Sequence, residues 1–217
     1  MSLPAFLILK KPDIELLKSK HDTEGLIRAL RSRDAGIPVA AARALGTLGP
    51  DVLDSLESAL KTRNNAVKLG IIGALSEIAS PHSVGSLERA LADENSEVRW
   101  QAAIALGEIA DPSATGPLQK ALRDPDKYVR YGAAFSLAKI GWEPPDPAER
   151  AYLYAAMQEW AALKETGKAA VPAVSGLIKD RDARVRAKAV ELLGEIGDAS
   201  ATPALMLFIS SSRSLNA

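Results

Sequence analysis

The chain has 217 residues, of which 47% are hydrophobic, and carries 27 basic and 27 acidic side chains. This balance argues against a generic nucleic-acid binder or a protein held on an anionic membrane, since both usually carry a surplus of lysine and arginine. Cysteine is absent, which excludes disulfides and thiolate chemistry and fits a cytoplasmic protein.

The first 22 residues are expected to cap the N-terminal end of the fold. The apolar run at residues 3–9 is too short to span a membrane. Its lysines follow the run, whereas a signal peptide carries its positive charges first. A short helix is predicted over residues 13–20.

Internal repeats begin near Thr23 and decide the architecture. A β-branched residue recurs at steps of 30, 31, 31 and 56 residues, so the last step exceeds the period by an insertion of 25. Leucine follows eight residues later, and leucine or isoleucine eleven residues later. Aspartate or asparagine, the preferred N-cap residues, stands three residues earlier. The recurring dipeptides are Ile37-Pro38, Val67-Lys68, Val98-Arg99, Val129-Arg130 and Val185-Arg186, and the caps are Asp34, Asn64, Asn95, Asp126 and Asp182.

Each repeat is therefore predicted to be a pair of antiparallel helices. Offsets 0, 4, 8 and 11 from the recurring valine fall on one helix face. Small residues such as Ala102 and Ala103 let helices approach closely, and Gly141 and Gly197 suit the left-handed turn that ends a helix. One pair cannot bury its apolar face alone, but stacked pairs can. We predict an all-α fold, an α-solenoid of about five to six short helix pairs with one inserted helix.

The inserted segment, residues 143–167, is expected to add one helix that packs on the stack. Asp146 as N-cap, Pro147 at the first helical position and Glu149 three residues after the cap are typical of a helix start. Trp160 is placed on the packed face. A single domain is expected, with a cap at residues 1–22, four repeats at 23–142, the inserted helix at 143–167, and one repeat plus a half-repeat at 168–217.

Three stretches carry a resemblance to a known family: ENSEVRWQAAIALGEIAD, PDKYVRYGAAFSLAKIGW and RDARVRAKAVELLGEIGD. They resemble the short HEAT-like repeats typified by phycobilisome (PBS) lyases, over residues 23 to about 209. The resemblance implies an armadillo-like helical stack whose second helices line a concave surface. A phycobilin lyase-like, chromophore-handling role is an alternative that it suggests, although one fold serves many functions.

No catalytic, cofactor or metal site is predicted. Some short HEAT-like proteins are di-iron hydroxylases that bind iron through His-Glu pairs. Here the two histidines, His21 and His82, are followed by Asp22 and Ser83. No glycine-rich phosphate loop follows a strand. The sequence therefore favours a non-catalytic protein without a cofactor or metal.

The basic column Lys68, Arg99, Arg130 and Arg186 has two interpretations. It could be a ladder for phosphates, as in HEAT-like DNA glycosylases. Alternatively each side chain ties neighbouring repeats together through the capping acids, and this interpretation is favoured because Asp126 and Asp182 would cancel much of the positive field.

A candidate partner-binding surface lies on the outward stripe of the second helices. Offsets 2 and 6 carry large apolar residues in the middle repeats, and Gln101 and Lys188 are expected as a polar rim. Offset 9 is small throughout, which we expect to leave room for a ligand. Alternatively the inserted helix or a second copy of the chain covers the stripe. The candidate residues are Leu69, Trp100, Gln101, Ile104, Tyr131, Phe135 and Lys188.

These observations predict an interaction scaffold that binds a partner protein or peptide in its concave groove. Nucleic-acid binding is a disfavoured alternative because the net charge is zero. No membrane partner is expected. Self-association through the C-terminal half-repeat is left open.

Overall fold

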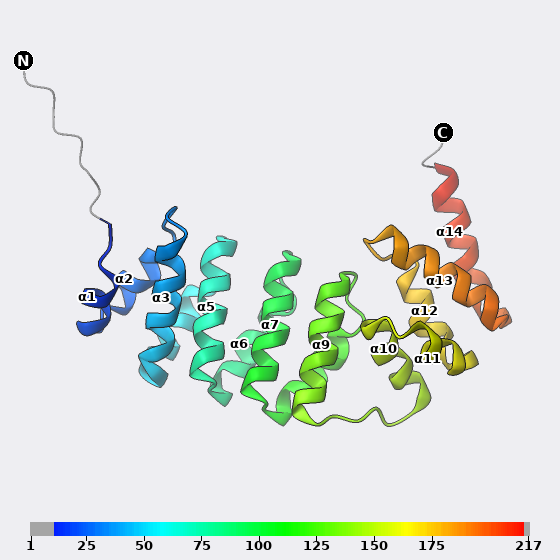
Figure 1. Cartoon of the computed structure of the whole chain (residues 1–217), viewed down its shortest axis with the longest axis horizontal. Helices are drawn as coiled ribbons and strands as arrows, with labels where there is room; N and C mark the ends of the chain where they lie inside the picture. The colour runs from blue at the N-terminus through cyan, green and yellow to red at the C-terminus, as the bar shows by residue number, and fades with distance from the viewer. Residues whose placement is uncertain (1–10, 215–217) are drawn as a thin grey trace, which may run out of the picture. The chain divides into compact units, whose positions relative to one another are not determined.

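The computed structural model describes residues 11–214, with side chains up to residue 210. This part of the chain forms 14 α-helices and five short 3-10 helices, and no strand (Figure 1). The helices belong to two compact units, Met1–Ser80 and Pro81–Ala217. The predicted all-α class of stacked helix pairs is confirmed.

The first unit contains two helix pairs and one additional helix. Helices α2 and α3 form one pair and α4 and α5 the next, while α1 packs against α2 and α3. Fully buried leucine and isoleucine side chains, among them Leu26, Leu45 and Ile71, fill its core. The elements are α1 (Ile14–Ser19), α2 (Thr23–Ala29), α3 (Gly36–Thr47), η1 (Gly49–Val52), α4 (Leu53–Ala59) and α5 (Asn65–Ile78).

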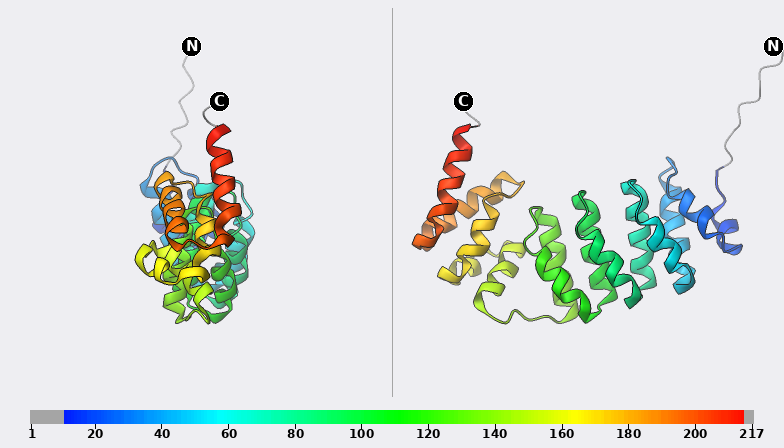
Figure 2. Two further views of the ribbon diagram at one scale, coloured as in Figure 1. Left: turned by 90° about the vertical axis from the view of Figure 1, so that its right-hand side faces the viewer. Right: turned by 180° about the vertical axis from the view of Figure 1, so that it is seen from behind.

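The second unit contains three regular pairs, α6 with α7, α8 with α9, and α12 with α13. The second helices α7 and α9 lie side by side, and each packs against the first helix of its own pair (Figures 1 and 2). The elements are η2 (Pro81–Ser83), α6 (Val84–Ala90), α7 (Ser96–Ile109), η3 (Pro112–Ala114), α8 (Thr115–Ala121), α9 (Lys127–Ile140), α10 (Pro147–Met157), α11 (Trp160–Glu165), η4 (Gly167–Ala170), α12 (Val171–Leu177), α13 (Ala183–Ile196), η5 (Ala199–Ala201) and α14 (Thr202–Ser214).

The predicted N-caps start four of the five second helices. The side chain of Asn95 accepts hydrogen bonds from the first-turn amides of α7, and Asp126 accepts one from the amide of Tyr128 at 2.9 Å. Asp34 is the exception. Its helix, α3, begins at Gly36, and the Asp34 carboxylate accepts from the Gly36 amide and pairs with Lys11 at 2.6 Å. A cap satisfies amides that would otherwise have no partner, so this local signal predicts helix starts well.

The inserted segment differs from the prediction, because it forms two helices, α10 and α11. The chain turns at Gln158, which has a left-handed backbone with φ of 59°. Helix α10 packs against α9 and α12, and α11 packs against α13. A single straight helix would present one face, whereas the turn lets both Ala155 and Leu163 enter the core of the unit, with Trp160 half-buried against it. The insertion therefore acts as an additional helix pair.

Candidate functional site

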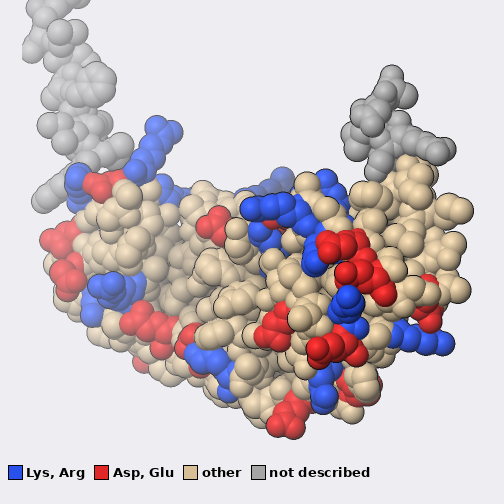
Figure 3. Space-filling view, turned by 45° about the vertical axis from the view of Figure 1, so that its right-hand side comes forward, with Lys and Arg blue, Asp and Glu red and all other residues tan. Residues whose placement is uncertain are grey.

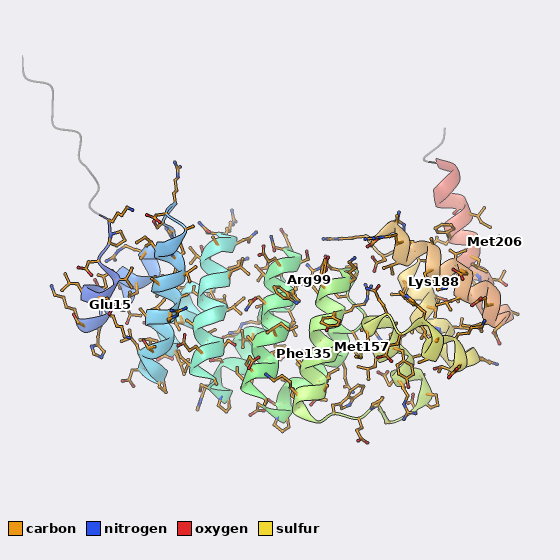
Figure 4. The ribbon with its side chains drawn as sticks, viewed as in Figure 1. Glu15, Arg99, Phe135, Met157, Lys188 and Met206 are labelled. Carbon is orange, nitrogen blue, oxygen red and sulfur yellow. The ribbon has the colours of Figure 1, made fainter. Side chains whose placement is uncertain are left out.

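The outward side of α7 and α9 exposes three large aromatic side chains at the predicted stripe. Trp100 on α7 is 37% exposed, and Tyr131 and Phe135 on α9 are 53% and 47% exposed. Figure 4 shows Phe135 in the middle of α9. Ile104 is half-buried beside them. We call Trp100, Ile104, Tyr131 and Phe135 the aromatic face.

Close packing between the two helices orients Trp100. A Cβ atom built on Gly132 of α9 would lie 2.9 Å from Cδ1 of Trp100 and 3.5 Å from Cδ1 of Ile104. These distances place the Trp100 and Ile104 side chains against the bare backbone of Gly132. The indole is therefore held against the neighbouring helix, and about a third of the Trp100 surface remains exposed to solvent.

Two cations and a fourth aromatic side chain extend this face. Tyr128, one turn before Tyr131, is 63% exposed, and the Lys127 ammonium lies 5.1 Å from its ring centre. Lys139 lies 5.8 Å from the ring of Phe135 and pairs with Glu108 of α7 at 2.8 Å. Sequence reasoning missed Tyr128, although its position three residues before Tyr131 places it on the same side of the helix.

The other candidate residues do not all join the aromatic face. Gln101 is half-buried on α7, directly after Trp100, and its role as a polar rim stays a prediction. Leu69 is half-buried on α5, in the first unit. Lys188 on α13 (Figure 4) pairs with Glu191 at 2.8 Å. It lines a pocket of about 370 Å³ with Lys127, Gln158, Trp160, Asp182, Arg184 and Val185.

The small residues at offset 9 serve helix packing at two of the five positions. A Cβ on Gly107 of α7 would lie 2.6 Å from Cβ and 2.9 Å from Cα of Ser136 on α9. Gly46 of α3 similarly faces the side chain of Glu77 on α5. The expectation that this column leaves room for a ligand is therefore wrong at these two positions, because a neighbouring helix occupies the space.

The basic column is structural within the second unit. Arg99 binds the Asp124 carboxylate through two nitrogens, at 2.7 and 2.9 Å, and this hydrogen bonding raises the pKa of Arg99. Arg130 pairs with the buried Asp180 and donates to the carbonyl of Asp124 at 2.8 Å. Arg186 donates to the carbonyl of Asp180 at 2.8 Å. These arginines bind the loops that precede the second helices.

The acids that pair with these arginines are not the predicted ones. Asp124 and Asp180 stand two residues before the capping residues Asp126 and Asp182. Each carboxylate accepts a hydrogen bond from the backbone amide of that capping residue. The arginine thus binds the loop of the following repeat through an acid that also shapes that loop. Because these carboxylates hold Arg99 and Arg130 in the interior, neither forms an exposed ladder for phosphates.

The inserted pair leaves the aromatic face exposed in the described residues. Helices α10 and α11 pack against the α12–α13 pair and against α9, and the exposures of Trp100, Tyr131 and Phe135 are those given above. Charges of both signs are interspersed on the side of the second unit that comes forward in Figure 3, with wide uncharged areas between them.

Within residues 11–214, no three His, Cys, Asp or Glu side chains come together in a way that could hold a metal ion. In the same part of the chain, none of the helices is long and apolar enough to cross a lipid bilayer.

Comparison with known proteins finds one family and a number of similar solved structures. No curated protein sequence matches the chain. Three crystal structures described as engineered proteins are similar to this chain. The first is 24% identical with a TM-score of 0.41, and the match covers 87% of this chain and 85% of that protein. The second is 23% identical with a TM-score of 0.40 and coverages of 89% and 62%, and the third is 22% identical with a TM-score of 0.41 and coverages of 86% and 86%. The family model for HEAT repeats matches residues 23–97, 86–162 and 143–214. Since these matches span nearly all of the helix pairs, the chain belongs to the family of HEAT repeat proteins.

Proposed function

We propose that the protein is a non-catalytic scaffold that binds a partner protein or peptide on the aromatic face of α7 and α9. HEAT repeats are generally protein-interaction scaffolds. The observation that carries the proposal for this chain is the cluster of exposed Trp100, Tyr131 and Phe135 on two adjacent second helices. Aromatic side chains of this kind supply most of the affinity in many interfaces.

The area of this cluster suits a docking surface. A large aromatic side chain offers roughly 150–250 Å², so with Tyr128 the four rings expose roughly 300–500 Å² at their observed exposures. This is comparable to the largest apolar patch on a typical monomer, about 300–600 Å², which is often functional. Burying it would remove unfavourable contact with water.

The face is also held in place before a partner arrives. Trp100 packs on Gly132, and Lys139 and Glu108 bridge α9 and α7 beside Phe135. Rings on packed helices lose little conformational freedom on binding, which improves affinity. Gln101, which follows Trp100 on α7, can supply a directional hydrogen bond. The phycobilin lyase-like and nucleic-acid alternatives stay predictions.

Selection from a displayed library of short random peptides tests the proposal. The bait is the full chain, and each enriched peptide is measured against Tyr131→Ala with Phe135→Ala. Met206→Ala with Leu207→Ala is the matched control, because these side chains are exposed apolar residues of α14. We expect the face variant to lose about tenfold or more in affinity and the control to bind like the parent.

The melting temperature of each variant is measured alongside, and we expect both to stay near that of the parent because the replaced side chains are half-exposed. Failure to enrich any peptide would overturn the proposal. So would enriched peptides that bind the face variant as tightly as the parent.

A further inference from the structure

The pocket beside the aromatic face is lined mainly by side chains that can donate hydrogen bonds. It lies among the start of α9, the turn between α10 and α11, and the first half of α13, and its volume is about 370 Å³. Its charged wall consists of Lys127, Arg184 and Lys188 with one acid, Asp182. Gln158 and Trp160 also line it and can donate through an amide and an indole N–H.

The acid in this pocket, Asp182, already accepts hydrogen bonds from its neighbours. Asp182 accepts from the Lys127 ammonium at 2.6 Å, from the backbone amide of Arg184 at 2.9 Å and from the Arg184 guanidinium at 3.4 Å. The hydrogen bond from Lys127 and those from Arg184 hold the pKa of Asp182 well below its usual range, so it remains a carboxylate. Lys188 pairs with Glu191 outside the pocket lining, so three cations face two acids and one positive charge remains for a further anion.

The pocket adjoins the aromatic face. Lys127, Tyr131 and Phe135 follow each other at intervals of four residues on α9. Residues four apart lie on one side of a helix, about 6 Å from each other. A ligand lying along α9 across Phe135 and Tyr131 therefore reaches Lys127 one helical turn further on, at the rim of the pocket.

The surrounding charges favour one carboxylate over a polyanion. Glu97, one turn before Trp100 on α7, and Glu108 both lie among the exposed residues of the same helix. Glu191 pairs with Lys188. A chain of phosphates that followed the face would meet these acids, whereas a single acidic side chain can enter the pocket alone.

We propose that this pocket binds an aspartate or glutamate side chain of the partner, in a peptide segment whose apolar side chains pack on the aromatic face. The inference rests on the proposed function and specifies the partner as an acidic-apolar peptide. Arg184, whose side chain is 89% exposed, pairs with Asp182, and Lys188 pairs with Glu191, so each meets the incoming carboxylate with its remaining N–H groups.

The test uses the peptides enriched on the full chain and the variant Arg184→Gln with Lys188→Gln. Lys120→Gln with Arg150→Gln is the control, because it removes the same charge from exposed positions elsewhere in the second unit. We expect the enriched peptides to share an acidic residue beside apolar ones. The pocket variant should weaken their binding about three- to tenfold, and the control should not.

Two further measurements show whether the acidic side chain is responsible. Replacing it in the peptide by its amide should weaken binding to the parent but not to the pocket variant. Raising the salt from about 0.1 to about 1 M shortens the Debye length from about 10 to about 3 Å and should reduce the difference between parent and variant.

The outcomes separate this inference from the proposed function. Peptides that need Tyr131 and Phe135 but contain no acidic residue, or that bind the pocket variant normally, overturn the pocket assignment and leave the scaffold function intact. Peptides indifferent to the aromatic face overturn both. A single-stranded oligonucleotide that binds the parent more tightly than the acidic peptides do, and loses affinity in the pocket variant, reassigns the pocket to nucleic acid and also overturns the inference.

Discussion

Two glycines at the same repeat position should respond oppositely to substitution by alanine. Gly107 in α7 and Gly194 in α13 both stand nine residues after the recurring valine. A Cβ on Gly107 would lie 2.6 Å from Cβ and 2.9 Å from Cα of Ser136, whereas a Cβ on Gly194 would meet nothing within 4 Å. The backbone atom of Ser136 cannot rotate away, so Gly107→Ala must push α7 and α9 apart.

The magnitude follows from two opposing effects. Replacing glycine by alanine inside a helix stabilises it by about 1 kcal/mol, and this gain is common to both variants. Overpacking costs about 1–3 kcal/mol, and only Gly107→Ala incurs it. The substitution also strains the hydrogen bond that the Ser136 hydroxyl donates to the carbonyl of Ala103 at 2.8 Å. Gly194→Ala should stabilise by up to about 1 kcal/mol, and the free energies of unfolding of the two variants should differ by about 1–3 kcal/mol.

Urea unfolding followed by tryptophan fluorescence measures this difference. All three tryptophans, Trp100, Trp142 and Trp160, belong to the second unit, so the signal reports the unit that contains both glycines. Equal stabilisation by the two substitutions would refute the reasoning, since it would mean that α7 and α9 have room for a methyl group between them.

Three more predictions concern single acids. Asp126→Ala should lower the free energy of unfolding by roughly 0.5–2 kcal/mol through the lost helix cap and leave peptide affinity intact, and unchanged stability with abolished binding would reverse this assignment. Asp180→Ala leaves the buried Arg130 without its carboxylate, so chemical denaturation should show a loss of about 3–5 kcal/mol, and a smaller loss than that of Asp126→Ala would contradict the ion pair's role. The pKa of Asp182 is depressed in the folded protein chiefly by Lys127, so its charge stabilises the fold at neutral pH and this contribution disappears as the pH falls below about 4. The difference in the free energy of unfolding between the parent and Asp182→Asn should therefore become smaller in acid. A difference that does not change with pH would disprove a stabilising charge on Asp182.

The helix pairs were predictable because their signals are local. Asn95 and Asp126 accept hydrogen bonds from amides two or three residues ahead, and the apolar positions of one face lie within a few turns. The repeat then multiplies each signal, so agreement among copies identifies the stack. The exposure of Trp100 and Tyr131 could also be predicted from the sequence, since an outward helical position in a stack of pairs has no core to enter.

The two-helix form of the inserted segment and the acids that pair with the arginines could not be predicted in this way. The left-handed residue at this turn is Gln158 and not a glycine, so the sequence carries no local signal for the turn. The turn is compensated by burial, since it lets both Ala155 and Leu163 enter the core. Arg130 and Asp180 are 50 residues apart, and their pairing depends on how α10 and α11 bring the following loop to α9. No spacing rule within one repeat predicts a contact across an insertion.

By itself, the sequence determined the class of fold, the starts of most second helices and the outward aromatic residues, because these depend on interactions within a few turns of one helix. Only the tertiary structure decided which glycine is crowded, which acid each arginine binds and that Lys188 joins Lys127 around a pocket. These features depend on the distance between helices that are far apart in the chain. That distance is set by the packing of whole side chains across the stack, which a one-dimensional pattern does not contain.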